Sequence, residues 1–147
     1  MPLRYEERSI AGTLVEADRL DLAADDVIEL LASSHNIGVW RLNIETNEYL
    51  LSAPCLAIFG FEKQDGMPGL LNFRSKIHPD DIPIVLEGID ACIQRQGSYM
   101  VTYRVQASGG HKFVRTIGRY RETAEGPELI GLTFELIDRL RELVVGD

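Results

Sequence analysis

The sequence predicts an α+β fold in which one five-stranded antiparallel sheet carries helices on one face. Two short alternating segments lie near the start of the chain, and three longer ones lie near its end. Between them is the strongest helical pattern, over residues 82–96. Strands placed before and after a block of helices are typical of an antiparallel sheet covered on one side. The strands are expected at residues 37–43, 49–51, 99–105, 112–121 and 129–136.

The expected strands place apolar residues at every second position, which is the two-residue period of a pleated strand, most clearly over residues 37–43 and 99–105. Trp40 and Leu42 share one face of the first strand. Ile130, Leu132 and Phe134 share one face of the last strand, and Phe134 is expected to point into the core. Turn-forming residues join neighbouring strands as hairpins. These turns are expected at residues 45–47, 108–110 and 125–127.

The helix over residues 82–96 repeats apolar residues at spacings of three and four, so one of its faces can pack on the sheet. Gly97 follows at the position where a helix commonly ends. A shorter helix is expected at residues 53–61, ended by Gly60, and residues 66–73 form a loop or a short helical turn. The apolar face of the long helix comprises Val85, Leu86, Ile89, Cys92 and Ile93.

Residues 1–33 are expected to form a helical extension ahead of the sheet. Its firmest helix covers residues 21–31, and residues 9–20 are a weaker helix because Gly12 interrupts them. An apolar stripe on such an extension must be covered by the sheet or by a second copy of the chain. The stripe comprises Ala24, Val27, Ile28 and Leu31.

The composition is that of one soluble domain. A chain of 147 residues fits a single core, and its hydrophobic content of 45% is ordinary for a globular protein. The formal net charge of -8 disfavours binding to nucleic-acid phosphates. The apolar runs are too short to span a bilayer and no signal-peptide core is recognisable, so we expect a cytoplasmic protein. Cys55 and Cys92 are expected to be reduced, buried thiols.

The motif His78-Pro79-Asp80-Asp81 precedes the strongest helix and has two interpretations. One imidazole and two carboxylates are metal ligands, but no other histidine lies near them in the sequence. Alternatively, the carboxylate of Asp80 or Asp81 caps the helix by accepting hydrogen bonds from its free N–H groups, and Pro83 fits the first turn. We favour capping and expect no metal site.

No catalytic constellation is recognisable in the sequence. His35 precedes the first strand and His111 follows the Gly109-Gly110 turn, so both are expected in solvent. Three histidines and two cysteines arranged in this way do not match a zinc site. A phosphate-binding glycine loop and a serine nucleophile elbow are also lacking. We therefore expect a non-catalytic protein.

In this order, the segments resemble a PAS domain of the subfamily with a His-Pro-Asp-Asp loop before its long helix. The resemblance covers residues 34–137 and implies a sensor and dimerisation module, such as the sensor part of a histidine kinase or a cyclic-nucleotide signalling protein. Residues 138–147 would start a C-terminal signalling helix. The matching segments are residues 38–42, 52–61, 77–81 and 103–105, followed by Gly118-Arg119 and Gly131.

The chain departs from the family at the end of its last strand. PAS sensors that feed a neighbouring output domain usually close on an Asp-Ile-Thr triplet, and the matching residues here are Glu135-Leu136-Ile137. The carboxylate is kept but the hydroxyl is lost, which argues against transmission of the usual kind. The apolar seam that follows, through Leu140 and Leu143, is shorter than the several heptads of a stable coiled coil.

The resemblance also reduces the number of cofactors that the chain could bind. PAS haem sensors of the oxygen-sensing type carry an axial histidine on the long helix, and residues 82–96 contain none. Flavin photosensors carry a reactive cysteine in an Asn-Cys-Arg-Phe-Leu motif, whereas Cys55 lies in Ala53-Pro54-Cys55-Leu56. We predict no bound cofactor, with haem and flavin both disfavoured.

In PAS domains a ligand cavity lies between the long helix and the inner face of the sheet. The same side chains can instead fill that space as a solid core, which we favour because apolar spacing does not distinguish the two. The hydroxyl of Tyr103 distinguishes a ligand cavity from a solid core, because a buried hydroxyl needs a hydrogen-bond partner from protein, water or ligand. Arg104, Arg115 and Arg119 are expected on the solvent side, where they can pair with carboxylates of a partner chain. The candidate lining residues are Phe59, Val85, Ile89, Cys92, Tyr103 and Phe134.

Two functional hypotheses compete. The first is a dimeric PAS sensor whose terminal helices change relative position when a small apolar or amphipathic ligand binds. The rival is a ligand-free module that dimerises or docks a signalling partner through the sheet face and the N-terminal helix. A haem or flavin sensor with an atypical anchor is a minor third. The residues expected at dimer or signalling contacts are Leu14, Leu20, Val27, Leu31, Leu136, Leu140 and Leu143.

Overall fold

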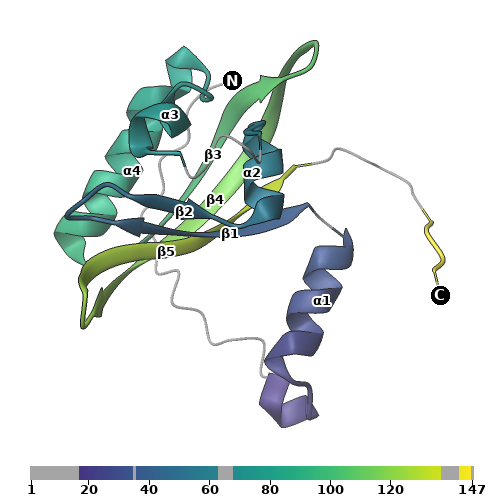
Figure 1. Ribbon diagram of the computed structural model, residues 1–147. Coiled ribbons are helices and arrows are strands. Elements are labelled where there is room, and N and C mark those ends of the chain that lie inside the picture. Colours follow the sequence, from purple (N-terminus) through teal and green to yellow (C-terminus); the bar gives the residue numbers. More distant parts are fainter. Residues whose placement is uncertain (1–16, 35, 63–67, 137–142, 147) are drawn as a thin grey trace.

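The structure is a computed structural model that describes residues 17–34, 36–62, 68–136 and 143–146 (Figure 1). The five strands form one antiparallel sheet in the order β2-β1-β5-β4-β3, so the first and last long strands lie side by side at its centre. Helices α2 and α4 pack on one face of this sheet. The predicted α+β architecture is therefore confirmed. The elements are η1 (Ala17–Leu20), α1 (Ala24–Ser34), β1 (Ile37–Asn43), β2 (Tyr49–Leu51), α2 (Ala53–Phe59), α3 (Leu70–Arg74), η3 (Pro79–Asp81), α4 (Ile82–Arg95), β3 (Ser98–Ala107), β4 (Gly110–Thr123) and β5 (Gly126–Glu135).

Local chemistry explains where the helices begin and end. Helix α1 begins at Ala24, three residues later than expected, because the Asp26 carboxylate accepts a hydrogen bond from the Ala23 N–H at 2.9 Å. Helix α4 ends where Gln96 takes a left-handed conformation with φ of 50°. The Gly97 N–H then bonds to the Cys92 carbonyl at 3.1 Å, which satisfies a carbonyl of the last turn. Among the described residues, no helix is long and apolar enough to cross a lipid bilayer.

The core lies between the inner face of the sheet and helices α2 and α4. Its centre depends on two glycines, Gly118 and Gly131, which lie opposite each other on β4 and β5. A Cβ added at Gly131 would overlap the Trp40 indole and the Ile117 carbonyl, and one at Gly118 would overlap the Tyr99 ring. The two aromatic rings therefore lie directly on strand backbone, which only glycine permits here.

The inward face of β5 is the opposite of the one predicted. Trp40 points into the core and pairs in register with Gly131, so Leu129 and Thr133 also point inward and are fully buried. Ile130, Leu132 and Phe134 consequently lie on the outer face. Periodicity misled the prediction because both faces of this strand carry apolar residues, and its neighbours across the sheet decide which one faces the core.

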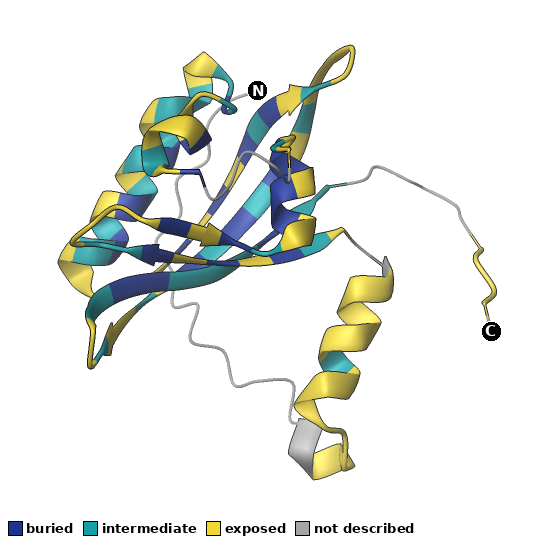
Figure 2. Ribbon diagram, in the orientation of Figure 1, coloured by how far each residue is buried: buried dark blue, intermediate teal, exposed yellow. Residues whose placement is uncertain are grey.

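Helix α1 lies apart from the sheet and is exposed along nearly its whole length (Figures 1 and 2). Ile28, on its apolar stripe, is 61% exposed. Helices α2 and α4 pack on the inner face of the sheet, and in the described part of the chain no helix packs on the outer face. The domain thus presents two apolar surfaces, one on a helix and one on a sheet, that no described residue buries.

Candidate functional site

The residues predicted to line a ligand cavity form part of a packed core. Phe59, Val85, Ile89, Cys92 and Tyr103 are all buried in one hydrophobic cluster. Aromatic rings fill the space between them: the Phe59 and Phe73 rings meet edge to face at 4.9 Å, and Phe73 meets Tyr49 at 5.0 Å. Phe134, the sixth predicted residue, lies on the outer face and does not belong to this cluster.

A chain of hydroxyl groups runs through this core. The Tyr103 hydroxyl bonds to Thr116 Oγ1 at 2.8 Å, and Thr116 Oγ1 bonds to Thr133 Oγ1 at 2.8 Å. Thr133 in turn hydrogen-bonds the Cys55 thiol. Burial raises the pKa of Cys55 to about 12, so the thiol stays protonated at neutral pH. The partner of the Tyr103 hydroxyl is therefore a protein side chain.

One polar atom of the core differs from the others. Among the described residues, the buried Nε1 of Trp40 has no hydrogen-bond partner. The Trp40 indole lies near the rings of Tyr49 and Tyr99, at centroid distances of 5.6 Å and 6.4 Å. An unpaired buried N–H is costly, and it marks a point where a hydrogen-bond acceptor would be favoured.

His78 caps the short helical turn η3 that precedes α4. The prediction that Asp80 or Asp81 caps this helix is therefore wrong. His78 Nδ1 accepts a hydrogen bond from the Asp80 N–H at 3.1 Å, whereas the Asp81 side chain makes no cap bond. The Asp81 carboxylate binds Arg104 instead. The fixed guanidinium of a neighbouring strand competes for the carboxylate, and sequence spacing cannot reveal such a partner. Nowhere in the described ranges do three metal-ligating side chains come together.

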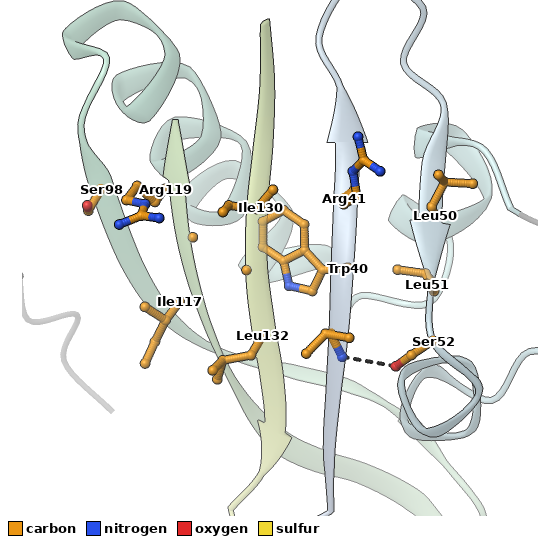
Figure 3. A pocket seen from close by; sticks show the side chains of 13 residues that line it. Trp40, Arg41, Leu50, Leu51, Ser52, Ser98, Ile117, Arg119, Ile130 and Leu132 are labelled. Carbon is orange, nitrogen blue, oxygen red and sulfur yellow. Dashed lines mark hydrogen bonds between the residues drawn. The ribbon is translucent and has the colours of Figure 1, made fainter. Parts of the chain in front are cut away.

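The outer face of the sheet carries an open apolar groove of about 840 Å³ (Figure 3). Val39 and Leu132 lie opposite each other on β1 and β5, and Ile117 continues the row on β4. Val39 is 58% exposed, which is unusual for a central strand. At one edge, Ser52 Oγ accepts the Val39 N–H at 2.9 Å and so completes the backbone pairing of β1. The groove is also lined by Arg41, Leu50, Arg119 and Ile130.

Positive charge borders this groove. Arg41 and Arg119 line it, and Arg121 lies next to it on β4. The Glu128 carboxylate accepts Arg41 Nε and Arg121 Nε, each at 2.9 Å. Burial alone would raise the pKa of Glu128, but these hydrogen bonds hold it below its ordinary value, so the carboxylate stays charged. The negative charge of Glu128 balances only one of the two positive charges of Arg41 and Arg121, and Arg119 adds a third positive charge.

Sequence reasoning did not identify this groove. Its signal was present, because Ile37 and Val39 lie on the outer side of β1 and both faces of β5 carry apolar residues. Only the pairing of Val39, Ile117 and Leu132 across three strands joins these separate residues into one surface.

The predicted dimer and signalling residues do not form one surface in the described structure. Leu20 and Leu31 are exposed, and Val27 is half-buried on α1. Leu136 is half-buried at the end of β5, and Leu143 is exposed in a segment without helix, residues 143–146. The remaining two positions, 14 and 140, lie outside the described residues, as does His35.

The profile of the PAS fold family matches residues 49–132, which is more than half of the chain. This chain belongs to the PAS family. PAS domains are sensory modules of signal transduction, and the sheet order and helix placement described above are those of the matched fold. A search of curated proteins finds no match.

Solved structures with this PAS fold come from several organisms. A sensory box histidine kinase/response regulator from Burkholderia thailandensis is 27% identical, with a TM-score of 0.58, over 74% of this chain and 83% of that one. The N-terminal domain of a diguanylate cyclase with PAS/PAC sensor from Marinobacter aquaeolei is 19% identical, with a TM-score of 0.54, over 67% and 94%. The PAS-B domain of Drosophila melanogaster Cycle with bound ethylene glycol is 14% identical, with a TM-score of 0.55, over 67% and 99%.

The carboxylate of Glu135 lies at the end of β5, where the PAS sheet closes. Glu135 Oε1 binds Lys112 Nζ at 2.6 Å, and Glu135 Oε2 accepts Asn36 Nδ2 at 3.3 Å. These contacts join the end of β5 to β4 and to the residue just before β1. The entry and exit of the domain therefore meet at one carboxylate.

Proposed function

We propose that this PAS domain is a non-catalytic regulatory module that acts through association with a second chain at the outer face of its sheet. The observation that carries the proposal is the open apolar groove around Val39, Ile117 and Leu132. Exposed contiguous apolar surface on a domain of this size marks an interaction site. Because Glu135 joins the entry and exit of the domain, a change of arrangement at the groove would reach both terminal segments.

The proposal includes a homodimer acting in the cytoplasm. Both cysteines are free and buried, which fits a reducing compartment. A dimer would bury the groove on two copies at once, and closed two-fold pairs are the commonest assembly of soluble proteins.

Light scattering on a sizing column tests the association. The wild-type chain is expected to have the mass of a dimer, and Val39→Glu is expected to shift it towards the monomer without changing the circular dichroism spectrum. Leu71→Glu is the matched control, because Leu71 is 79% exposed on α3, away from the groove. A wild-type chain that stays monomeric at all accessible concentrations, or a dimer unaffected by Val39→Glu, would refute the proposal.

A second candidate function is ligand sensing in the interior, and the unpaired Trp40 Nε1 favours it. The ligand would be a small amphipathic molecule with a hydrogen-bond acceptor. Absorption spectroscopy and denaturing mass spectrometry of freshly purified protein test this, with haem and flavin detected by the same spectrum. A released small molecule that is lost in Trp40→Phe supports sensing, and a colourless protein free of small molecules counts against it.

A further inference from the structure

Two histidines that are far apart in the sequence meet at one junction of the fold. The His78 and His111 rings lie 4.6 Å apart between centroids, with their planes inclined at 58°. His78 is the residue just before η3, and His111 is the second residue of β4, directly after the turn from β3. The His78 side chain is only 20% exposed, so its ring is largely covered at this junction.

The hydrogen bond made by His78 identifies the ring nitrogen that lacks a proton. His78 Nδ1 lies 3.1 Å from the Asp80 backbone nitrogen and accepts its N–H, so the proton of the neutral ring is on Nε2. A second proton can therefore be added only at Nδ1. Adding it turns the acceptor into a donor, and the cap of η3 is lost.

The same hydrogen bond argues against a metal ion at the pair. A neutral imidazole binds a metal through its one unprotonated nitrogen, and in His78 that nitrogen already accepts the Asp80 N–H. The described residues also contain no group of three metal-ligating side chains. The ligand that this arrangement accommodates is therefore a proton.

The carboxylates near the pair compensate little for the lost cap. Asp80 Oδ2 lies 4.0 Å from His78 Nδ1, but the Asp80 side chain is 80% exposed, and solvent weakens its attraction for an imidazolium. The Asp81 carboxylate is bound by the Arg104 guanidinium of β3. These two opposite charges largely cancel at the His78 ring.

The basic groups around the pair disfavour additional positive charge. Arg104 lies on β3 beside His78, and Lys76 lies on the loop that leads to it, where its Nζ is 5.3 Å from the centre of an aromatic ring. Lys112 follows His111 on β4 and is paired with a carboxylate of β5. If both histidine rings are protonated, two cations also repel each other across 4.6 Å.

We propose that His78 and His111 form an acid-sensitive contact between η3 and the β3–β4 hairpin. When both rings are neutral, they pack together and His78 caps the turn. When His78 binds a proton at Nδ1, the Asp80 N–H loses its acceptor, the rings separate and the entry to α4 loosens. A proton is thus an input to the domain that is independent of association at the outer groove, because none of these three residues lines the groove.

Urea unfolding at about pH 7.5 and about pH 5.5 tests the proposal, because imidazoles change charge in this range and most carboxylates do not. The unfolded chain binds the proton without losing a cap, so acid favours unfolding. We expect acidification to lower the folding equilibrium constant about 3- to 10-fold more in the wild type than in His78→Asn, which keeps an acceptor but does not titrate. His111→Asn should reduce the loss in part, and Asp80→Asn should enlarge it, because the nearest carboxylate no longer attracts the imidazolium.

The matched control is His35→Asn, the same change at the third histidine, which lies outside the described residues. NMR gives a second readout: the Asp80 amide proton should move upfield on acidification in the wild type, as its hydrogen bond is lost, and stay in place in His78→Asn. Equal responses of wild type and His78→Asn would overturn the proposal. So would a response that disappears in His35→Asn, or one that is smaller in Asp80→Asn than in the wild type.

Discussion

The Asp81 carboxylate and the Arg104 guanidinium form a bidentate ion pair that joins the start of α4 to the edge strand β3. Arg104 Nε and Nη2 lie 2.8 Å and 2.7 Å from the two carboxylate oxygens, and the Arg104 backbone N–H lies 2.9 Å from Oδ2. His78 extends the same junction, because its backbone N–H bonds to the Arg104 carbonyl at 2.9 Å. The loop before α4 is thus held to the sheet through one carboxylate.

Replacing that carboxylate with an amide should loosen the junction. We expect Asp81→Asn to lower the free energy of unfolding at pH 7 by about 1 kcal/mol, which is below the range of about 1.5–3 kcal/mol for hydrogen bonds to charged groups because this pair is partly exposed. Urea unfolding followed by circular dichroism measures the change. Asp80→Asn is the control, since the Asp80 side chain is 80% exposed, and an equal loss in both variants would contradict the assigned role.

The Asp81–Arg104 pair should make the free energy of unfolding depend on pH in the acidic range. Hydrogen bonds from Arg104 lower the pKa of Asp81 below its ordinary value, so the unfolded chain binds this proton more readily than the folded one. The contribution is complete above the unfolded pKa of about 4 and is lost as the pH falls through the lower, folded value. The stability difference between wild type and Asp81→Asn should therefore be constant from pH 8 to 6 and shrink in more acidic buffers. A difference that grows on acidification would contradict this.

The glycine at the centre of β5 should tolerate no side chain. In Gly131→Ala the new Cβ would approach Trp40 Cε2 within 2.7 Å, so we expect a loss of about 1–3 kcal/mol from overpacking. Gly69→Ala is the control because a Cβ there meets nothing within 4 Å. Thermal unfolding measures the melting temperatures of the two variants. Equal values would contradict the prediction, because they would show that the core rearranges to accept the added methyl group.

Removing the Thr133 hydroxyl from the hydrogen-bonded chain in the core should destabilise the domain. In Thr133→Val, Thr116 and Cys55 each lose a buried partner, and we expect the free energy of unfolding to fall by about 1–3 kcal/mol. Thr102→Val, on the exposed face of β3, should cost less. Chemical denaturation of both variants measures the difference, and a neutral Thr133→Val would mean that the hydroxyl bonds contribute little.

Both thiols should be inert while the domain is folded. Burial raises the pKa of Cys55 to about 12 and also raises the pKa of Cys92, so neither is a thiolate at pH 8. We expect iodoacetamide to label the native chain only at the rate of unfolding and to label two cysteines per chain in denaturant. Mass spectrometry counts the adducts, and rapid labelling of the native chain would contradict the burial of these thiols.

The histidine cap should be replaceable by another acceptor. His78→Ala removes the acceptor for the Asp80 N–H and should cost about 1 kcal/mol, whereas His78→Asn keeps an acceptor and should lose less. Comparing their midpoints of urea unfolding tests this order. The reverse order would indicate that the His78 ring contributes through its contact with His111, at 4.6 Å between centroids.

Strong local patterns were sufficient for the sheet and for helix α4. The three-and-four spacing of Val85, Ile89 and Cys92 predicted the buried face of α4, because a helix near a sheet has one apolar side. The same reasoning failed for Phe134, since β5 has apolar residues on both sides. It also failed for Asp81, whose partner Arg104 is remote in sequence. The groove was missed because its floor combines single residues from three strands.

The amino-acid sequence by itself determined the PAS fold, the order of its strands and helices, and an acidic, amphipathic α1, since each depends on periodicity and turn chemistry within a short segment. The tertiary structure decided which face of β5 is buried, that His78 and not an aspartate caps the turn before α4, and that Val39, Ile117 and Leu132 meet in one groove. The buried face of β5 and the groove depend on the register between strands, which places Trp40 against Gly131, far apart along the chain. The choice of His78 as the cap depends on Arg104, a residue of β3 that binds the Asp81 carboxylate.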